Sequence, residues 1–340
     1  MNENKLILSS SPHMHGIYTT RRIMLDVIVA LVPALVAAVI FFGWRALLLC
    51  AISAAACVLF EWAYRKMMKL DCTVGDLSAV VTGLLLALVC PVSLPIWILV
   101  IGDLFAIVVV KQLFGGIGKN FVNPALAARA LMFVSWATAM TDFGTAAETG
   151  NTASTAISGS GFVIDAVSSA TPMGILNKAS ADGICLLDMF LGKIGGCIGE
   201  TCAIALLLGL VYLVLRRVIT VRIPLSYILT VAVIAFVFPQ GGSSLPYRLT
   251  WCAAQVLGGG LLLGAIFMAT DYVTSPVTGL GQILYGIGCG LITVAIRYFF
   301  TYPEGVTFAI LLMNACSGIF DRFGRLPRFG AAKRKEGVGV

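Results

Sequence analysis

The chain has 340 residues, of which 59% are hydrophobic and only 11% are charged. Soluble domains carry about 25% charged residues, so this composition excludes a soluble globular protein and predicts a membrane protein. The net charge of +7 does not indicate nucleic acid as a partner, because the basic residues stand at the ends of apolar segments. Most of the ten cysteines lie inside apolar runs and none forms a CxxC pair, so we expect no metal or iron–sulfur site within this chain.

Apolar segments near the length of a membrane span recur along the chain. A helix needs about 20 residues to cross a hydrocarbon core of about 30 Å. We expect ten such spans, at residues 24–43, 46–64, 77–93, 95–114, 125–140, 194–215, 224–239, 251–269, 281–300 and 305–320. The fifth, seventh and tenth are short, which predicts broken or irregular helices beside them. The first span continues at full length after a polar lead-in, so no cleavable signal peptide is predicted.

These spans divide the chain into five regions. They are an amino-terminal segment (1–23), a first five-helix half (24–140), a long loop (141–193), a second five-helix half (194–320) and a basic tail (321–340). Halves with an odd number of spans have opposite orientations in the membrane, as in many transporters. The expected fold class is therefore an all-α polytopic membrane protein of about ten transmembrane helices, built as two inverted five-helix halves.

The positions of Lys and Arg predict the orientation of the chain. With ten spans both termini share one side, and that side holds all of the 23 Lys and Arg residues except five: Arg45, Lys178, Lys193, Arg248 and Arg297. The positive-inside rule places this basic side in the cytoplasm. We therefore expect a multi-pass protein of the inner (cytoplasmic) membrane, with cytoplasmic termini and the loop 141–193 outside.

The loop 141–193 contains the most specific motif, DAVSSATP at residues 165–172. The hydroxyl of Thr171 can form a phosphoester, and Pro172 restricts Thr171 to an extended backbone that presents it to a modifying enzyme. Asp165 is a candidate to hold a metal ion or phosphate during that transfer. Three small residues let the enzyme approach closely: Ser168, Ser169 and Ala170. The alternative is a turn of small residues with local Asx and Ser hydrogen bonds.

A second stretch, GGIGKNFVNPALAAR at residues 115–129, joins the fourth and fifth spans. Asparagine amides both donate and accept hydrogen bonds, which suits the polar edge of a heterocycle near Asn120 and Asn123. Gly118 permits close backbone approach, and Lys119 is adjacent. The spacing is not that of a phosphate-binding loop. The alternative is a tight turn followed by a helix that Asn123 caps, and the two roles are compatible.

Two acidic residues inside predicted spans are candidates for an ion path, because a carboxylate in an apolar span is costly and usually functional. They are Glu200 in the sixth span and Asp103 in the fourth, with Lys111 two turns after Asp103. The alternative is a buried carboxylate bonded to the backbone or to a neighbouring subunit, which we favour for Asp103. His13 and His15 are interpreted as part of a solvated lead-in rather than as metal ligands.

These motifs together resemble the D subunit of the Rnf ion-translocating ferredoxin:NAD oxidoreductase and the related B subunit of the sodium-pumping NADH:quinone reductase. The resemblance runs from His13 to about Arg322 and includes the stretches at 268–276 and 302–307. It implies FMN attached to Thr171 through a phosphodiester bond. Ser169 stands where glycine is common, as in the Rnf variant of the motif. It also implies a non-covalent riboflavin near Asn120 and Asn123.

The resemblance further implies a fold like that of urea and ammonium channels. The implied activity is electron transfer between ferredoxin and NAD coupled to export of Na⁺ or H⁺, in a translocase of which this chain is one non-catalytic subunit. Its expected partners are the other Rnf subunits, which supply iron–sulfur clusters and further flavin, a flavin transferase for maturation, and the lipid membrane. Two other functions remain possible, a small-solute channel or transporter without redox role and a cofactor-free scaffold. Neither explains the motif at 165–172.

Overall fold

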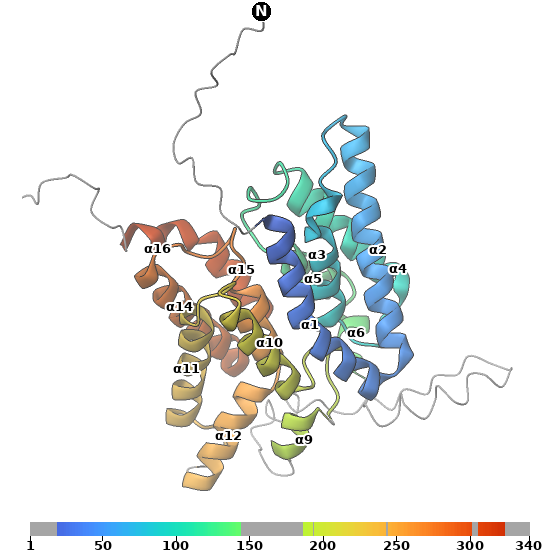
Figure 1. Cartoon of the computed structure of the whole chain (residues 1–340). Helices are drawn as coiled ribbons and strands as arrows, with labels where there is room; N and C mark the ends of the chain where they lie inside the picture. Colours follow the sequence, from blue (N-terminus) through green and yellow to red (C-terminus); the bar gives the residue numbers. More distant parts are fainter. Residues whose placement is uncertain (1–18, 144–185, 193, 243, 301–304, 324–340) are drawn as a thin grey trace, which may run out of the picture.

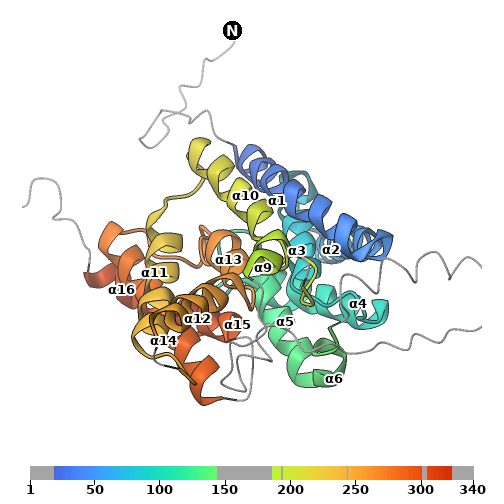
Figure 2. The same ribbon diagram turned by 90° about the horizontal axis from the view of Figure 1, so that it is seen from below.

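The computed structural model describes residues 19–143, 186–192, 194–242, 244–300 and 305–323. Within these ranges the chain is helical and contains no strand. Figure 1 shows two groups of helices side by side, one formed by the chain before residue 144 and the other by the chain after residue 193. Helices α1 and α10 lie side by side and form part of the contact between the two groups (Figure 2). The division of the chain into two inverted five-helix halves stays a prediction.

The first group consists of α1 (Thr20–Phe42), α2 (Trp44–Met67), the short 3₁₀ turn η1 (Val74–Asp76), α3 (Ser78–Leu88), α4 (Ile96–Leu104), α5 (Pro124–Ser135) and α6 (Ala137–Met140). Helix α4 continues without interruption into the π-helix η2 (Phe105–Gln112). One residue, Gly43, joins α1 to α2 with a φ of +73°, a backbone conformation that glycine adopts without strain. The two longest helices therefore form a tight antiparallel pair.

The second group consists of α10 (Ala203–Leu215), α11 (Arg222–Val237), α12 (Leu245–Leu257), α13 (Leu261–Leu263), α14 (Gly279–Phe299), α15 (Val306–Ala315) and α16 (Ser317–Phe323). The short helix α9 (Leu186–Leu191) precedes it, and α13 continues into the π-helix η3 (Gly264–Met268). Helix α14 begins where the side chain of Thr278 accepts a hydrogen bond from the N–H of Gly281. The chain thus uses the same few helix-start signals in both groups.

Three described helices are long and apolar enough to cross a membrane: α1, α2 and α14. The pair of α12 and the α13–η3 segment would make a fourth span that bends by 55° at its break. Each of the ten predicted spans contains a described helix, and the fifth and tenth are interrupted at Trp136 and Cys316 as short segments suggest. The seventh is one continuous helix, α11. The count of ten crossings stays a prediction.

The predicted start of the sixth span is wrong. Helix α10 begins only at Ala203, and residues 194–202 form an irregular segment before it. The backbone N–H groups of Ile198 and Gly199 donate to the carbonyls of Cys90 and Leu88 over 3.0 and 2.7 Å. These carbonyls lie at the carboxyl end of α3, where a helix leaves carbonyls without partners of its own. Glu200 therefore lies in a buried turn rather than inside a helix.

Helix α1 shows the side-chain pattern of a helix that faces both protein and lipid. Small residues face the interior, and Ala30, Ala34 and Ala38 are each at most 3% exposed. A Cβ atom added to Gly209 of α10 would lie 2.6 Å from the carbonyl oxygen of Ala30, so the two backbones approach closely. Large apolar residues such as Val36 and Ile40 are exposed on the opposite face. This distribution is the reverse of a soluble core and indicates a lipid-facing surface.

Candidate functional site

The turn between η2 and α5 carries two of the predicted binding residues into the interior. Asn120 and Asn123 are buried, whereas Gly118 and Lys119 are exposed. The Nδ2 group of Asn120 donates to the carbonyl of Val122 over 3.1 Å, which fixes the turn locally. The structure therefore brings the two asparagines together and leaves Gly118 and Lys119 at the surface.

Asn123 caps α5 and also connects the two groups of helices. Its Oδ1 atom accepts from the N–H groups of Ala125 and Leu126 over 3.0 and 3.4 Å, and Pro124 occupies the first helical position. Its Nδ2 group donates to the carbonyl of Met268 in η3 over 3.3 Å. The prediction of a helix cap at this position is confirmed. These contacts leave one Nδ2 hydrogen for a ligand.

A cavity of about 110 Å³ lies beside these asparagines, between the two groups of helices. Its walls are mainly apolar side chains from α1, α3, α10 and η3. The polar side chains that line it are Ser78, Thr82, Lys111, Asn120, Asn123, Thr270 and Asp271. The cavity is therefore an apolar pocket with several hydrogen-bonding groups, a composition typical of small-molecule sites.

The donor and acceptor groups of this cavity suit the edge of a flavin ring, which needs both kinds of partner. The part of the cavity that the protein encloses is about 110 Å³, against about 300–1,000 Å³ for most small-molecule pockets. The enclosed part therefore accounts for contacts with one edge of the ring and not for the whole flavin.

Asp271 lines the cavity from the segment between η3 and α14. Its carboxylate accepts from the N–H of Val273 over 3.4 Å and from the hydroxyl of Thr274 over 3.3 Å. Burial raises the pKa of the Asp271 carboxyl, and these two hydrogen bonds oppose that rise. The neighbouring Tyr272 donates its hydroxyl to the carbonyl of Val218, which follows α10. This segment therefore closes the cavity on the side of the second group.

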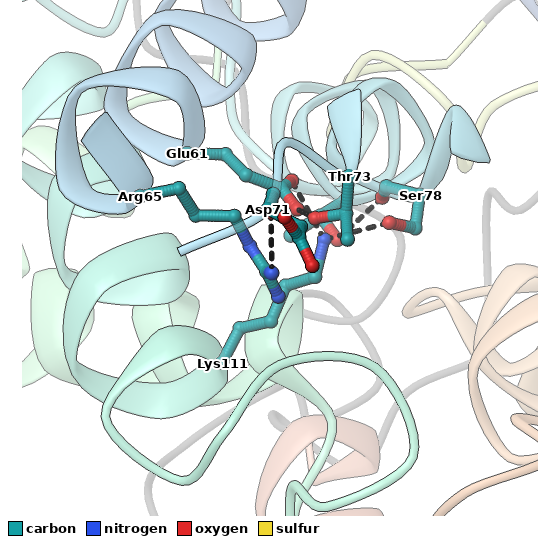
Figure 3. Close-up of polar contacts among 7 residues, drawn as sticks. Glu61, Arg65, Asp71, Thr73, Ser78 and Lys111 are labelled. Carbon is teal, nitrogen blue, oxygen red and sulfur yellow. Dashed lines mark hydrogen bonds and ion pairs between the residues drawn. The ribbon is translucent and has the colours of Figure 1, made fainter. Parts of the chain in front are cut away.

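A buried ion pair lies on the other side of the cavity, between α2 and η2 (Figure 3). The Nζ atom of Lys111 lies 2.9 Å from Oε2 of Glu61 and donates to the hydroxyl of Ser78 over 2.7 Å. The hydroxyl of Thr73 donates to the other carboxylate oxygen of Glu61 over 2.7 Å. Glu61 is fully buried and Lys111 nearly so. Glu61 is not among the residues predicted from the sequence, although an acidic residue within the apolar segment 46–64 is a sufficient signal.

Asp103 lies deeper in the first group, on α4, and is 0% exposed. Its Oδ1 atom accepts from the hydroxyl of Ser53 over 2.6 Å and from the thiol of Cys57 over 3.2 Å, both on α2. Its Oδ2 atom has no hydrogen-bond partner within the part of the chain that the structure describes. The backbone also changes from α to π geometry directly after this turn, at Phe105. Irregular helix of this kind is frequent at functional sites.

Glu200 forms an ion pair at the centre of the molecule. Its Oε1 atom lies 3.4 Å from a guanidinium nitrogen of Arg129 on α5, and both side chains are buried. Arg129 also donates to the hydroxyl of Thr307 on α15 over 3.0 Å and to the sulfur of Cys197 over 3.3 Å. The pair thus joins both groups of helices and the irregular segment before α10. Lys111 and Arg129 count as cytoplasmic in the charge analysis, and both are in fact buried against carboxylates.

The break between α12 and α13 has opposite charges on its two sides. Arg297 of α14 donates to the carbonyls of Gln255 and Gly258 at the end of α12, over 2.6 and 3.1 Å. On the other side Gly260 precedes α13 with a φ of +67°, and a Cβ atom added there would lie 2.2 Å from Oε1 of Glu200. A cation at the carboxyl terminus of a helix and an anion at the amino terminus both interact favourably with the helix dipole, and each stabilises its helix. The two charged residues therefore stabilise the broken helix.

The motif of the long loop lies outside the described residues. This applies to Asp165, Ser168, Ser169, Ala170 and Thr171, and also to His13 and His15. The described ends of the loop lie in α6 and α9, at the lower end of the molecule in Figure 1. The turn that holds Asn120 lies at the opposite end, next to the carboxyl end of α2. Among the described residues, no group of three His, Cys, Asp or Glu side chains is placed to hold a metal ion.

Comparison with known proteins gives consistent results over almost the whole chain. The model of the NQR2, RnfD, RnfE family matches residues 7–330. The D subunit of the Na⁺-translocating ferredoxin:NAD⁺ oxidoreductase complex from Acetobacterium woodii is 44% identical over 339 residues, which cover 99% of each chain.

Two further relatives extend this comparison. The D subunit of the proton-translocating ferredoxin:NAD⁺ oxidoreductase complex from Clostridium ljungdahlii is 37% identical over 98% of each chain. The D subunit of an ion-translocating oxidoreductase complex from Escherichia coli is 33% identical over 96% of this chain and 99% of its own. All three names describe the D subunit of an ion-translocating oxidoreductase complex, and the two that name a cation name different ones.

Proposed function

The chain belongs to the NQR2, RnfD, RnfE family, and from this premise we propose that it carries flavin within an ion-translocating ferredoxin:NAD oxidoreductase. Two of its relatives are D subunits of such complexes, and in this proposal the chain is a membrane subunit that is not catalytic alone. The chain couples electron transfer to the export of Na⁺ or H⁺. Moving one charge across 100 mV costs about 2.3 kcal/mol, which the redox reaction has to supply.

One flavin in this proposal is FMN, attached by a phosphodiester bond to the hydroxyl of Thr171. The motif DAVSSATP at residues 165–172 supports this site, because it offers a hydroxyl among small residues. Family membership over the whole chain supports it further. When bound, the flavin accepts and donates electrons, and the protein positions it and sets its potential. Attachment requires a flavin transferase, and the onward path requires subunits with iron–sulfur clusters and further flavin.

A second flavin in the proposal is riboflavin, bound without a covalent bond near Asn120 and Asn123. The support is the set of hydrogen-bonding groups around the cavity that these residues line. Asn123 would offer its remaining amide hydrogen, and Lys111 would offer a positive charge at the cavity wall. The contacts proposed here concern one edge of the ring only, the edge that faces the enclosed part of the cavity.

The proposed orientation has both termini in the cytoplasm and the loop 141–193 outside an inner membrane. The described ends of that loop lie opposite the turn at Asn120, so the two flavins would lie near opposite faces. Two of the basic residues that favour this orientation, Lys111 and Arg129, are buried in ion pairs and carry less weight. The exposed basic residues Lys66 and Lys69 near the end of α2, together with the half-buried Arg65, still favour it.

The ion path of the proposal passes the buried carboxylates, with Glu200 and Asp103 as the first candidates. Both side chains are buried within the protein. Buried ionisable groups at such depth are rare without a function. The two relatives that name a cation name different ones, so the resemblance does not choose between Na⁺ and H⁺.

The test of the proposal is in-gel fluorescence of the chain. The chain is expressed with the other subunits and a flavin transferase, denatured, and separated on a gel under ultraviolet light. A covalent flavin gives a bright band in the wild type and a dark band in Thr171→Ala. Acid treatment of the same preparation should release free riboflavin into solution.

The matched control is Thr155→Ala, which removes another hydroxyl of the same loop and should leave the band bright. A dark band in the wild type, with the transferase active on a second substrate, would contradict the flavin proposal. That result would favour a small-solute transporter or a scaffold built on the same helices.

A further inference from the structure

Polar residues form a stripe along one face of α2. Ser53, Cys57 and Glu61 are spaced by four residues, so they lie on the same side of the helix. All three are 0% exposed, because this side packs against α4 and η2. The stripe faces Asp103 at one end and Lys111 at the other. This polar stripe is therefore buried within an otherwise apolar group of helices.

Asp103 differs from the other carboxylates that the structure buries from solvent, a set that does not include the partly exposed Asp271 of the cavity wall. Asp26 lies 3.1 Å from Arg216, Glu61 lies 2.9 Å from Lys111, and Glu200 lies 3.4 Å from Arg129. The side chains that contact Asp103 are a hydroxyl and a thiol, both directed at the same oxygen. Three carboxylates thus have a cation beside them within the described part of the chain, and Asp103 has none.

A carboxylate buried without a cation costs several kcal/mol, because protein replaces the water that would solvate its charge. The cost disappears when the carboxyl holds a proton, and the Oδ2 atom is the position left open for it. A metal cation is a poorer solution here. Hard cations need a set of oxygen ligands, and the side chains that contact Asp103 offer one hydroxyl and one thiol.

We propose that Asp103 is a proton-exchanging site of the ion path. In the resting protein its carboxyl is protonated at Oδ2. During turnover the O–H bond breaks, the proton passes to water, and the carboxylate that remains is later protonated again from water. The role in turnover rests on the proposed ion-translocating function, whereas the protonated resting state does not depend on it.

The structure provides a connection between Asp103 and the cavity. Cys57 contacts Asp103 and stands one turn from Glu61 on the same face of α2. Glu61 is paired with Lys111, and Lys111 and Ser78 line the cavity (Figure 3). The polar stripe of α2, continued by Lys111, therefore leads from the packed interior to a space that is large enough for water.

The other ionisable groups near Asp103 interact with partners of their own and do not balance its charge. On α2 these are Cys57, which donates to Asp103, and Glu61, which is paired with Lys111 of η2. Helix α3 offers the backbone carbonyl of Gly83, which lies 2.9 Å from the hydroxyl oxygen of Ser53, and no charged side chain. On α5, Arg129 is engaged with Glu200. The charge of Asp103 is therefore not balanced by any described element that packs against it.

The first experiment is infrared spectroscopy of the purified complex in H₂O and D₂O. The carbonyl band of a protonated carboxyl, which shifts in D₂O, should be present in the wild type and lost in Asp103→Asn. Asp26→Asn is the matched control, because Asp26 is paired with Arg216 and should contribute no such band. Asn has the shape of a protonated Asp, so the variant should assemble normally, which size-exclusion chromatography checks.

The second experiment measures ion transport in vesicles that contain the whole complex. Asp103→Asn should lower ferredoxin-driven ion transport at least tenfold and leave the in-gel flavin fluorescence unchanged. The proposal is overturned if the infrared band persists in Asp103→Asn, if added Na⁺ abolishes the band of the wild type, or if transport by the variant is normal. Loss of flavin fluorescence in the wild type would instead overturn the proposed function, so the two failures are distinguishable.

Discussion

The centre of the molecule and the interior of its first helix group each hold a carboxylate that the sequence marks as a candidate for an ion path. At the centre, Glu200 lies against the guanidinium of Arg129, which also bonds Thr307 and Cys197. In the first group, Asp103 accepts hydrogen bonds from Ser53 and Cys57, with no cation beside it among the described residues. Hydropathy identifies both as costly, and only the structure shows that one is compensated by charge and the other is not.

This difference separates a carboxylate that stabilises the fold through an ion pair from a carboxyl that can exchange its proton. In a buried ion pair that also joins two groups of helices, neither partner changes its charge easily. Loss of one charge leaves the other charge buried without a partner, which is costly in an interior of low dielectric constant. A carboxyl held by a hydroxyl and a thiol can change its protonation state without breaking an ion pair. We therefore expect substitutions at the centre to affect stability most, and substitution of Asp103 to affect stability least.

The largest effect is expected for Arg129→Ala. This change leaves Glu200 buried without its cation, which typically costs about 3–5 kcal/mol. Titration of the purified complex with a denaturing detergent, followed by circular dichroism, measures the loss. The double variant with Glu200→Gln should recover at least half of it, since it removes the unpaired charge. Equal losses in the single and double variants would show that Arg129 acts through packing and not through the ion pair.

A smaller loss is expected for Gly260→Ala at the break before α13. The residue adopts a φ of +67°, and the new Cβ atom would lie 2.2 Å from Oε1 of Glu200. Backbone strain and overpacking together should cost about 2–4 kcal/mol in the same titration. Gly75→Ala is the control, because its Cβ atom would meet nothing within 4 Å. If both variants were equally stable, the close approach of Glu200 to the break would be refuted.

The smallest effect is expected for Asp103→Asn, which replaces a protonated carboxyl by an amide of the same shape. The free energy of unfolding should change by less than about 1 kcal/mol, since no charge is lost and the bonds from Ser53 and Cys57 remain possible. The same titration provides the measurement, with Arg129→Ala as the reference for a large loss. A loss as large as that of Arg129→Ala would mean that the carboxylate is ionised in the folded protein.

The sequence predicts the positions of the apolar helices well, because hydrophobic segments of spanning length have few alternative structures. It also predicts the cap at Asn123, where Asn followed by Pro is a local signal. It does not predict that the sixth segment starts as an irregular turn. The three glycines at 195, 196 and 199 lie in an otherwise apolar stretch, so hydropathy alone reads the segment as part of a span. The hydrogen bonds that hold the segment to the end of α3 involve residues about 110 positions earlier in the chain, which a local pattern does not reveal.

The partners of buried charges are equally hidden from the sequence. Glu61 and Lys111 are 50 residues apart, and Arg129 and Thr307 are 178 apart. Each contact depends on how the helices pack, which periodicity within one helix does not specify. Charge counting for membrane orientation fails at the same residues, because it assumes that Lys111 and Arg129 lie at the membrane surface.

The most direct test of the proposed function is the mass of the peptide that spans residues 165–177 in the protein from its native host. Our account predicts one added FMN group, with loss of one water, on Thr171. The same peptide without added mass, in cells that contain an active flavin transferase, would contradict it.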